Sequence, residues 1–299
     1  LLSPAAEAAL RLAADDSLSP RQRQDRLRAR LSVEQVRLVC EQASLRLRAR
    51  EKFSLADRMF FTSQGLQQAT DQYVAQHKAR RFADLGRVFD LCTGIGGDLQ
   101  ALARGNREVA GYDRDPATAL VAQSNATLVL ANACGAASPR VTVHSRDVRM
   151  LPLDDCDAWH IDPDRRPSGR RTTQVDLHEP SAAEMGVLLA RNSNAAIKLA
   201  PAARWPEDWT SRAELEWIGR ARQCRQLVGW FGRLAVRPAT RRATILDPAG
   251  NCLRTVLDPP DSADSPVPLG AIDAYLFEPD PTVIAARLTE SLAIEHQLR

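Results

Sequence analysis

Short apolar runs alternate with longer stretches of helical periodicity from residue 87 onward. Runs bounded by Gly, Asp or Pro are typical of buried strands, and the apolar spacing between them is that of helices. This alternation predicts βαβ units around a mainly parallel sheet, so we expect an α/β fold. The predicted strands cover residues 88–92, 108–112, 141–145, 158–161 and 195–199. Further elements are expected at 214–218 and 241–246, and residues 224–230 are predicted to form a helix.

The first 80 residues contain few β-branched runs and read as helices. Ser19 is a predicted N-cap followed by a proline at the first helical position, and Ser32 with Gln35 has the spacing of a capping box. A linker rich in Pro and Asp covers residues 257–268, after which 271–284 reads as a strand, a turn and a helix. We expect a helical domain over 1–80, a central domain over 81–256, and the start of a truncated accessory module over 269–299.

Composition places the chain among ordinary globular proteins, with 44% hydrophobic and 26% charged residues. No apolar run approaches the roughly 20 residues that cross a bilayer, and no signal peptide is visible, so no membrane partner is expected. The six cysteines form no C-x-x-C pair and have no His at ligand spacing, which argues against a metal site and a disulfide framework. We therefore expect a cytoplasmic location.

The formal net charge is only +3, but the basic residues are unusual in kind and place. Three are lysines, and all the others are arginines. Many arginines fall in the N-terminal helical region, at 21, 23, 26, 28 and 30 and again at 46, 48 and 50. Such a cationic lobe would suit a phosphate backbone. A solvated helix surface in an Arg-rich chain explains the same pattern, and both interpretations stay open.

A glycine-rich turn follows the first predicted strand, in the stretch Val88-Phe-Asp-Leu-Cys-Thr-Gly-Ile-Gly-Gly-Asp98. A strand that runs through glycines into a helix brings backbone N–H groups close to a ligand. The G-x-G-G spacing does not match the dinucleotide fingerprint, and the Lys-Ser/Thr of a P-loop is missing. The alternative is a turn that serves only strand–helix packing.

Carboxylates follow the predicted strands, and ligands of parallel sheets bind at the carboxyl ends of strands. Asp113 ends the second strand, where an acidic side chain accepts hydrogen bonds from the ribose hydroxyls of a nucleotide cofactor. Asp147 follows the third strand and Asp162 follows the fourth. Asp115 is interpreted as the N-cap of the next helix. Together these residues predict a nucleotide-type ligand at one edge of the sheet.

Two basic side chains in predicted strands have no assigned role. A lone His such as His160 is more often a satisfied core residue than a base. Lys198 either reaches the mouth of the site or lies along a sheet edge with its ammonium in solvent.

The motifs together resemble bacterial class I S-adenosylmethionine (SAM)-dependent methyltransferases with a THUMP-like C-terminal domain. The resemblance rests on D-L-C-x-G-I-G-G-D at 90–98, D-x-D-P at 113–116, D-P-x-R-R at 162–166 and Y-L-x-E-P-D-P at 275–281. The segment 60–63 is also similar to one that precedes the glycine motif in trimethylguanosine synthase-like RNA methyltransferases. The resemblance implies a Rossmann-like sheet and SAM as cofactor. The implied cofactor-binding residues are Thr62, Asp90, Cys92, Gly94, Gly96, Asp98, Asp113, Arg114, Asp147, Val148 and Asp162.

The same resemblance implies particular roles within that set. Asp90 would orient the methionine end of SAM, and Asp113 would hold the ribose. Asp147 would accept a hydrogen bond from the adenine amino group, with the Val148 backbone N–H on a ring nitrogen. THUMP-like domains imply RNA as a partner.

The implied reaction centre is Asp162-Pro163, where amino-methylating relatives carry N-P-P-Y or D-P-P-Y. There the first side chain and the next carbonyl hold an exocyclic amino group. This chain has Arg165 where the relatives have an aromatic residue, and a guanidinium can stack on a base or bind phosphate. The predicted catalytic residues are Asp162, Pro163 and Arg165, and the predicted RNA-binding residues are Arg165, Arg166, Arg170 and Arg171. A solvated loop is the alternative for the arginines.

The resulting functional prediction is a SAM-dependent methyltransferase acting on RNA, either tRNA or rRNA. An exocyclic base nitrogen such as guanine N2 is the expected acceptor. Two alternatives remain: a methyltransferase for an acidic small molecule or protein, and a non-catalytic SAM-binding RNA-binding protein. Neither the methylated position nor the oligomeric state can be read from the sequence.

Overall fold

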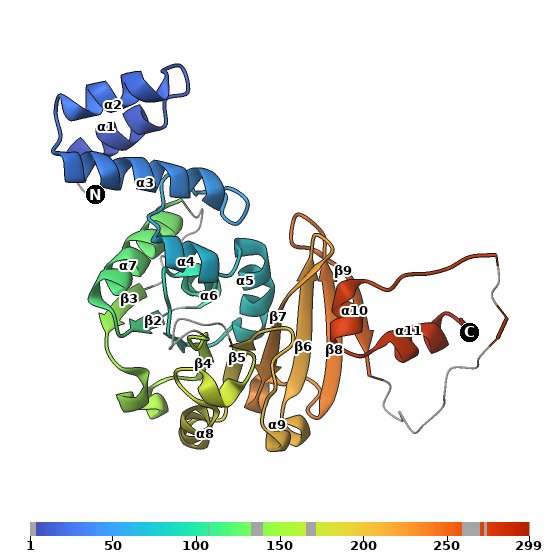
Figure 1. Cartoon of the computed structure of the whole chain (residues 1–299). Coiled ribbons are helices and arrows are strands. Elements are labelled where there is room, and N and C mark those ends of the chain that lie inside the picture. Colours follow the sequence, from blue (N-terminus) through green and yellow to red (C-terminus); the bar gives the residue numbers. More distant parts are fainter. Residues whose placement is uncertain are drawn as a thin grey trace.

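The computed structural model describes residues 4–106, 108–132, 140–165, 172–258, 270–271 and 274–298. At its centre is a nine-stranded sheet in the order β3-β2-β1-β4-β5-β7-β6-β8-β9, flanked by helices (Figure 1). The expected α/β fold is confirmed. The strands are β1 Arg87–Leu91, β2 Glu108–Asp113, β3 Arg140–Ser145, β4 Ala158–Ile161, β5 Ala195–Leu199, β6 Glu214–Arg220, β7 Gln223–Trp230, β8 Thr240–Leu246 and β9 Cys252–Leu257.

The strands β1 to β5 pair in parallel, and β7 lies antiparallel between β5 and β6. The prediction of a helix over 224–230 is therefore wrong. The apolar end of β7 is buried on both faces of the sheet, so its side chains lack the alternation that marks a strand. The β6–β7 hairpin also turns through Ala221 and Arg222, both at positive φ, without the Asn-Gly or Asp-Gly signal of such turns.

Helices cover both faces of the sheet (Figure 1). On one face α5 (Gln72–Ala79), α6 (Gly97–Gly105) and α7 (Pro116–Ala131) bury Val74, Leu99 and Ala126 against the strands. On the other face α8 (Ala182–Arg191), α9 (Glu207–Arg212) and α10 (Pro281–Ala285) bury Met185, Trp209 and Val283. The two apolar layers hold the sheet rigidly and fix the positions of its strand ends.

The N-terminal helices are α1 (Pro4–Ala13), α2 (Pro20–Arg28), α3 (Val33–Ala49) and the short α4 (Ser63–Gln68). Capping boxes at Ser19 and Ser32 begin α2 and α3, as the sequence predicts. Helices α1 to α3 share a small apolar cluster that includes Leu10, Leu27 and Val39. Helix α5, in contrast, packs on the sheet, so the chain passes from lobe to sheet before residue 80.

The predicted strand in 271–284 is absent from the described residues, whereas the predicted helix is α10 with Asp280 as its N-cap. Tyr275, Leu276 and Phe277 are exposed and pair with no described strand. Their apolar run resembles a strand, but a strand needs a neighbouring edge to satisfy its backbone. A last helix, α11, covers Thr289–Glu295. Among the described residues, no helix is long and apolar enough to cross a membrane.

Candidate functional site

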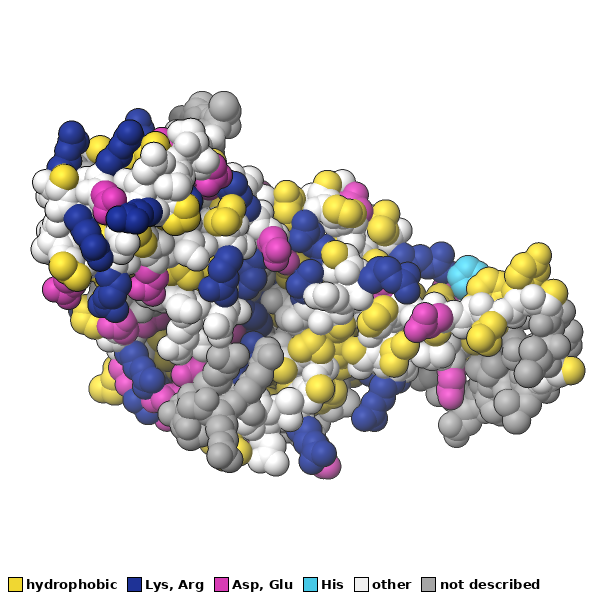
Figure 2. Space-filling model, turned by 45° about the horizontal axis from the view of Figure 1, so that its top comes forward, with side chains coloured by type: hydrophobic (Ala, Val, Ile, Leu, Met, Phe, Trp, Pro, Cys, Tyr) yellow, Lys and Arg dark blue, Asp and Glu magenta, His cyan; other side chains and the backbone are white. Residues whose placement is uncertain are grey.

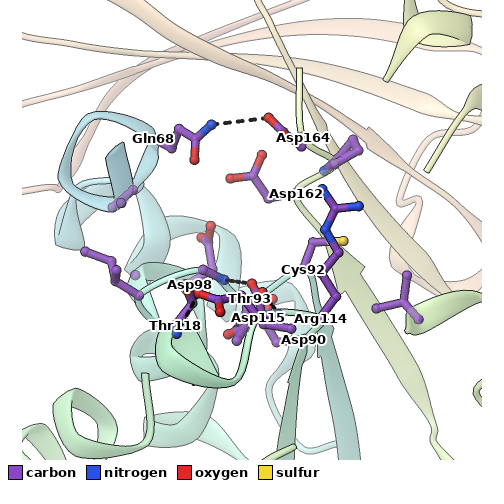
Figure 3. Close-up of a pocket in the computed structure, with 18 of the residues that line it drawn as sticks. Gln68, Asp90, Cys92, Thr93, Asp98, Arg114, Asp115, Thr118, Asp162 and Asp164 are labelled. Carbon is purple, nitrogen blue, oxygen red and sulfur yellow. Dashed lines mark hydrogen bonds between the residues drawn. The ribbon is translucent and has the colours of Figure 1, made fainter. Parts of the chain in front are cut away.

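A cavity of about 310 Å³ opens at the carboxyl ends of β1, β2 and β4, beside the glycine turn and under α4 (Figure 3). The carboxyl ends of parallel strands meet at one edge, so residues far apart in sequence line the same space. The predicted residues that line it are Thr62, Asp90, Cys92, Gly94, Asp98, Asp113, Arg114, Asp147, Val148, Asp162, Pro163 and Arg165. Arg166, Arg170 and Arg171 lie outside the described residues.

Gly96 is the predicted cofactor residue that does not line the cavity. It begins α6 at φ +87°, in the left-handed region that favours glycine, and a Cβ there would meet the Ala122 backbone at 3.4 Å. Gly96 therefore allows the turn to pack against α7. Gly94, at φ +55°, has open space where its Cβ would project, and it lines the cavity.

Asp113 is anchored to the glycine turn. The Gly94 N–H donates to its Oδ2 at 3.0 Å, and the Asp115 N–H donates to its Oδ1 at 3.0 Å. Burial raises the pKa of the Asp113 carboxyl, although these two hydrogen bonds oppose the shift. Each oxygen keeps acceptor capacity for a second donor from the cavity. Asp115 caps α7 as predicted.

Asp147, which the resemblance assigns to the adenine amino group, already accepts hydrogen bonds from the protein. It caps the short helix Val148–Met150, and its oxygens accept from the side chain of Arg149. These hydrogen bonds from Arg149 lower the pKa of Asp147. Arg149 also pairs with Glu184 on α8, so Asp147 is fixed from the far side of the site. Val148 is buried next to it and lines the cavity.

A chain of buried polar side chains forms one wall of the cavity. His160 is 1% exposed, and its Nδ1 lies 2.7 Å from Oδ1 of Asp90, whose Oδ2 accepts from Thr93 at 2.6 Å. The Nε2 of His160 lies 3.1 Å from Nζ of Lys78. Lys78 continues the chain with an ion pair of 2.7 Å to Asp98. The carboxylate oxygens of Asp90 and Asp98 are thus largely occupied by hydrogen bonds and ion pairs within the protein. Both ring nitrogens of His160 have partners, so His160 is the hydrogen-bonded core residue that the sequence predicts.

Asp162 is held by a side chain that the sequence left unassigned. The Nζ atom of Lys198 lies 2.5 Å from its Oδ2, and the same ammonium donates to the carbonyl of Gln68 at 3.3 Å. The Gln68 side chain in turn donates to Oδ1 of Asp164 at 3.3 Å, across the cavity from α4 to the loop after β4 (Figure 3). Lys198 therefore reaches the site mouth, the first of the two alternatives.

Sequence reasoning missed Gln68 and Lys78 and left Lys198 with two alternatives, although a compositional signal was present. The chain has only three lysines among its 40 basic residues. Lys78 and Lys198 belong to the networks just described, and Lys52 donates to the carbonyls of Leu66 and Ala69 at the end of α4. A compact ammonium with three rotatable donors fits such enclosed positions better than a planar guanidinium. Among the described residues, no cluster suited to a metal ion is found.

The strand order, with β7 reversed between β5 and β6, and the cavity above a glycine turn together define the fold of the class I SAM-dependent methyltransferases. The chain is similar over 97% of its length to a crystal structure of a Porphyromonas gingivalis W83 protein named a methyltransferase, with a TM-score of 0.73, 20% identity and 74% of that chain covered. This likeness shows the fold. No protein-family model matches the chain.

Two curated relatives come from Mycobacterium tuberculosis, strains CDC 1551 and H37Rv. Both are named uncharacterized S-adenosylmethionine-dependent methyltransferases, MT3122 and Rv3037c. Each is 30% identical over 243 residues, which are 80% of this chain and 62% of the relative. The chain therefore spans about three fifths of the length of the curated relatives that it matches.

Proposed function

We propose that this protein is a SAM-dependent methyltransferase that acts on RNA, with an exocyclic base nitrogen such as guanine N2 as the acceptor. One observation carries the proposal: a nucleotide cradle made by Gly94 and Asp113 opens into the same cavity as Asp162 and Pro163. The names of the curated relatives and the methyltransferase fold support the same cofactor.

The residues of the cavity fit SAM. Asp113 offers two fixed carboxylate oxygens, which suit paired ribose hydroxyls, and Gly94 leaves open space at the turn. Buried Val148 and the backbone beside it would border the adenine. A volume of about 310 Å³ lies at the lower end of the range for ligand cavities, which suits an extended ligand that leaves one end open to an acceptor. SAM, when bound, supplies a methyl group on a sulfonium that needs no further activation.

The protein itself then has to align the acceptor with the methyl donor. Asp162 and the carbonyl of Pro163 would accept the two N–H bonds of an amino group, so that its lone pair points toward the methyl donor. Such positioning removes much of the entropic part of a bimolecular barrier. Arg165 lines the same cavity and would stack on the base or bind a phosphate.

The exposed arginines of the N-terminal helices favour RNA as the substrate. Arg26, Arg28 and Arg30 are exposed around the end of α2, and Arg37 and Arg48 are exposed on α3. Figure 2 shows basic side chains spread over this end of the molecule. Helix α4, which lines the cavity with Thr62 and Gln68, follows α3 directly. Because α4 is the next helix after α3 and packs against it, we expect one polyanion to reach both the basic lobe and the cavity. A THUMP-like module beginning near residue 269 would add a further RNA contact.

Three measurements test the proposal. Calorimetry with S-adenosylhomocysteine (SAH) should give a saturable site, and labelled SAM should transfer its methyl group to total RNA. RNA binding should weaken with salt, and the double variant Arg26→Ala/Arg30→Ala should lower the salt slope by about one per arginine. Arg212→Ala on α9, an exposed arginine on the other side of the sheet, is the matched control. Methylation of a small acidic metabolite or a protein instead of RNA would contradict the proposal that RNA is the substrate. Absence of SAH binding would contradict the proposal that the protein is a SAM-dependent methyltransferase.

A further inference from the structure

Lys198 and Asp162 occupy equivalent positions on neighbouring strands. In the parallel pair β4–β5, Ile161 is in register with Ile197, so the next residue of each strand emerges at the same edge of the sheet. The Lys198 residue is 6% exposed, and its Nζ lies 2.5 Å from Oδ2 of Asp162. The Asp162 side chain is 24% exposed and lines the cavity. One carboxylate oxygen thus faces a buried ammonium while the side chain still reaches the ligand space.

We propose that Lys198 is a positioning residue for methyl transfer: it fixes the Asp162 carboxylate so that Oδ1 is presented to the amino group of the acceptor. This inference rests on the proposed function and adds a residue to it. In the reaction the acceptor nitrogen bonds the methyl carbon as the sulfur–carbon bond breaks, SAH departs, and the surplus proton on nitrogen leaves to water. Because the step depends on alignment, a carboxylate that rotates freely would present the amino group less often in a reactive pose.

The Lys198 ammonium has a second partner, and the effect of that contact must be distinguished from the effect of the contact with Asp162. It donates to the carbonyl of Gln68 and so helps to hold the end of α4 over the cavity. A purely structural role would act through α4. Lys52 provides the matched control, because it donates to the carbonyls of Leu66, Gln67 and Ala69 in the same stretch and makes no hydrogen bond to Asp162.

The test compares Lys198→Met, Lys198→Arg, Asp162→Asn and the double variant Lys198→Met/Asp162→Asn in the full chain, with Lys52→Met as the control. Lys198→Met should lower kcat by about 100-fold, as expected for lost positioning. The Kd for SAH should change by less than about threefold, because no cofactor group contacts Lys198 in the proposed arrangement. Lys198→Arg should restore part of kcat. The double variant should be no slower than Asp162→Asn alone, since Lys198 acts through that carboxylate.

Three outcomes would overturn the inference: losses that multiply in the double variant, a kcat unchanged in Lys198→Met, or a loss in Lys52→Met equal to that in Lys198→Met. If the wild-type chain transfers no methyl group, the proposed function fails. A second measurement then still tests whether Lys198 and Asp162 are energetically coupled. A thermal-unfolding cycle of the wild type, the two single variants Lys198→Met and Asp162→Asn, and the double variant should show that the two substitutions are not additive. Additive unfolding effects would show that the two side chains are not coupled.

Discussion

The Nζ atom of Lys78 lies 2.7 Å from Oδ1 of Asp98, and both side chains are buried beneath the candidate cavity. Burial acts to raise the pKa of Asp98, but the Lys78 ammonium, His160 and Lys198 outweigh it and lower that pKa. The pair links α5 to the first turn of α6 and therefore joins the segment after α4 to the glycine turn.

Removing one partner of this pair should be strongly destabilising. We expect Lys78→Met to lower the free energy of unfolding by about 3–5 kcal/mol, because Asp98 is left as an uncompensated buried charge. Asp98→Asn added to Lys78→Met should recover part of this loss. Urea denaturation measures both effects, and a loss below about 1 kcal/mol in Lys78→Met would show that water or another cation replaces the ammonium.

Acid should weaken the sheet through Glu216. Burial alone would raise its pKa, but His77, Arg81 and Thr244 hold it at about 2, below the ordinary 4.5. A carboxyl with a lowered folded pKa contributes stability above its unfolded pKa and loses it as the pH falls through the folded pKa. The contribution, about 3 kcal/mol, should disappear between pH 4.5 and 2.

This pH dependence can be isolated by substitution. Glu216→Gln should flatten the fall of unfolding free energy over that pH range, although the variant is less stable at neutral pH. Glu41→Gln, an exposed carboxylate on α3, should leave the profile unchanged. Parallel profiles for the wild type and Glu216→Gln would contradict the role of Glu216.

Helix α4 approaches the glycine turn closely at Gly65. A Cβ there would lie 2.4 Å from Cγ2 of Ile95 and 2.7 Å from Oγ1 of Thr62. We expect Gly65→Ala to lower the free energy of unfolding by about 1–3 kcal/mol and to weaken SAH binding, because α4 must move off the cavity.

A second glycine provides the control for the same substitution. A Cβ on Gly186, inside α8, would meet no atom within 4 Å. Gly186→Ala should raise the free energy of unfolding by up to about 1 kcal/mol and leave SAH binding unchanged. Thermal unfolding and calorimetry compare the two, and similar effects from both would contradict the close approach at Gly65.

Asp113 should control cofactor affinity more than stability. Asp113→Asn replaces one acceptor oxygen with a donor that faces either the Gly94 or the Asp115 N–H. We expect the Kd for SAH to rise about 10- to 100-fold, which corresponds to about 1.4–2.8 kcal/mol. Calorimetry measures this change, with Asp208→Asn on the exposed side of α9 as the control. Wild-type affinity in Asp113→Asn would remove Asp113 from the cofactor site.

Local sequence signals predicted the parallel half of the molecule well. The strands β1, β2, β4 and β5 carry a short apolar run, β3 alternates Val with polar residues, and each strand ends at or within three residues of Gly, Asp or Pro. The strands and their ends are therefore encoded locally. The caps at Ser19, Ser32 and Asp115 are equally local. The β7 strand was missed because its apolar residues Cys224, Leu227, Val228 and Trp230 also have the spacing of a helix, and because its Ala221-Arg222 turn carries no hairpin signal.

Local sequence patterns alone place Gly94, Asp113, Asp147 and Asp162 after parallel strands, whose carboxyl ends meet at one edge of the sheet. The folded structure shows which of the carboxylates that line the cavity are already engaged by buried protein groups. Asp90 and Asp98 line the cavity but are buried and engaged by His160 and Lys78, whereas Asp162 pairs with Lys198 and keeps 24% of its side chain exposed. The physical reason is that a buried charge requires a partner, and that partner is supplied by a different element of the chain, here α5, β4 or β5.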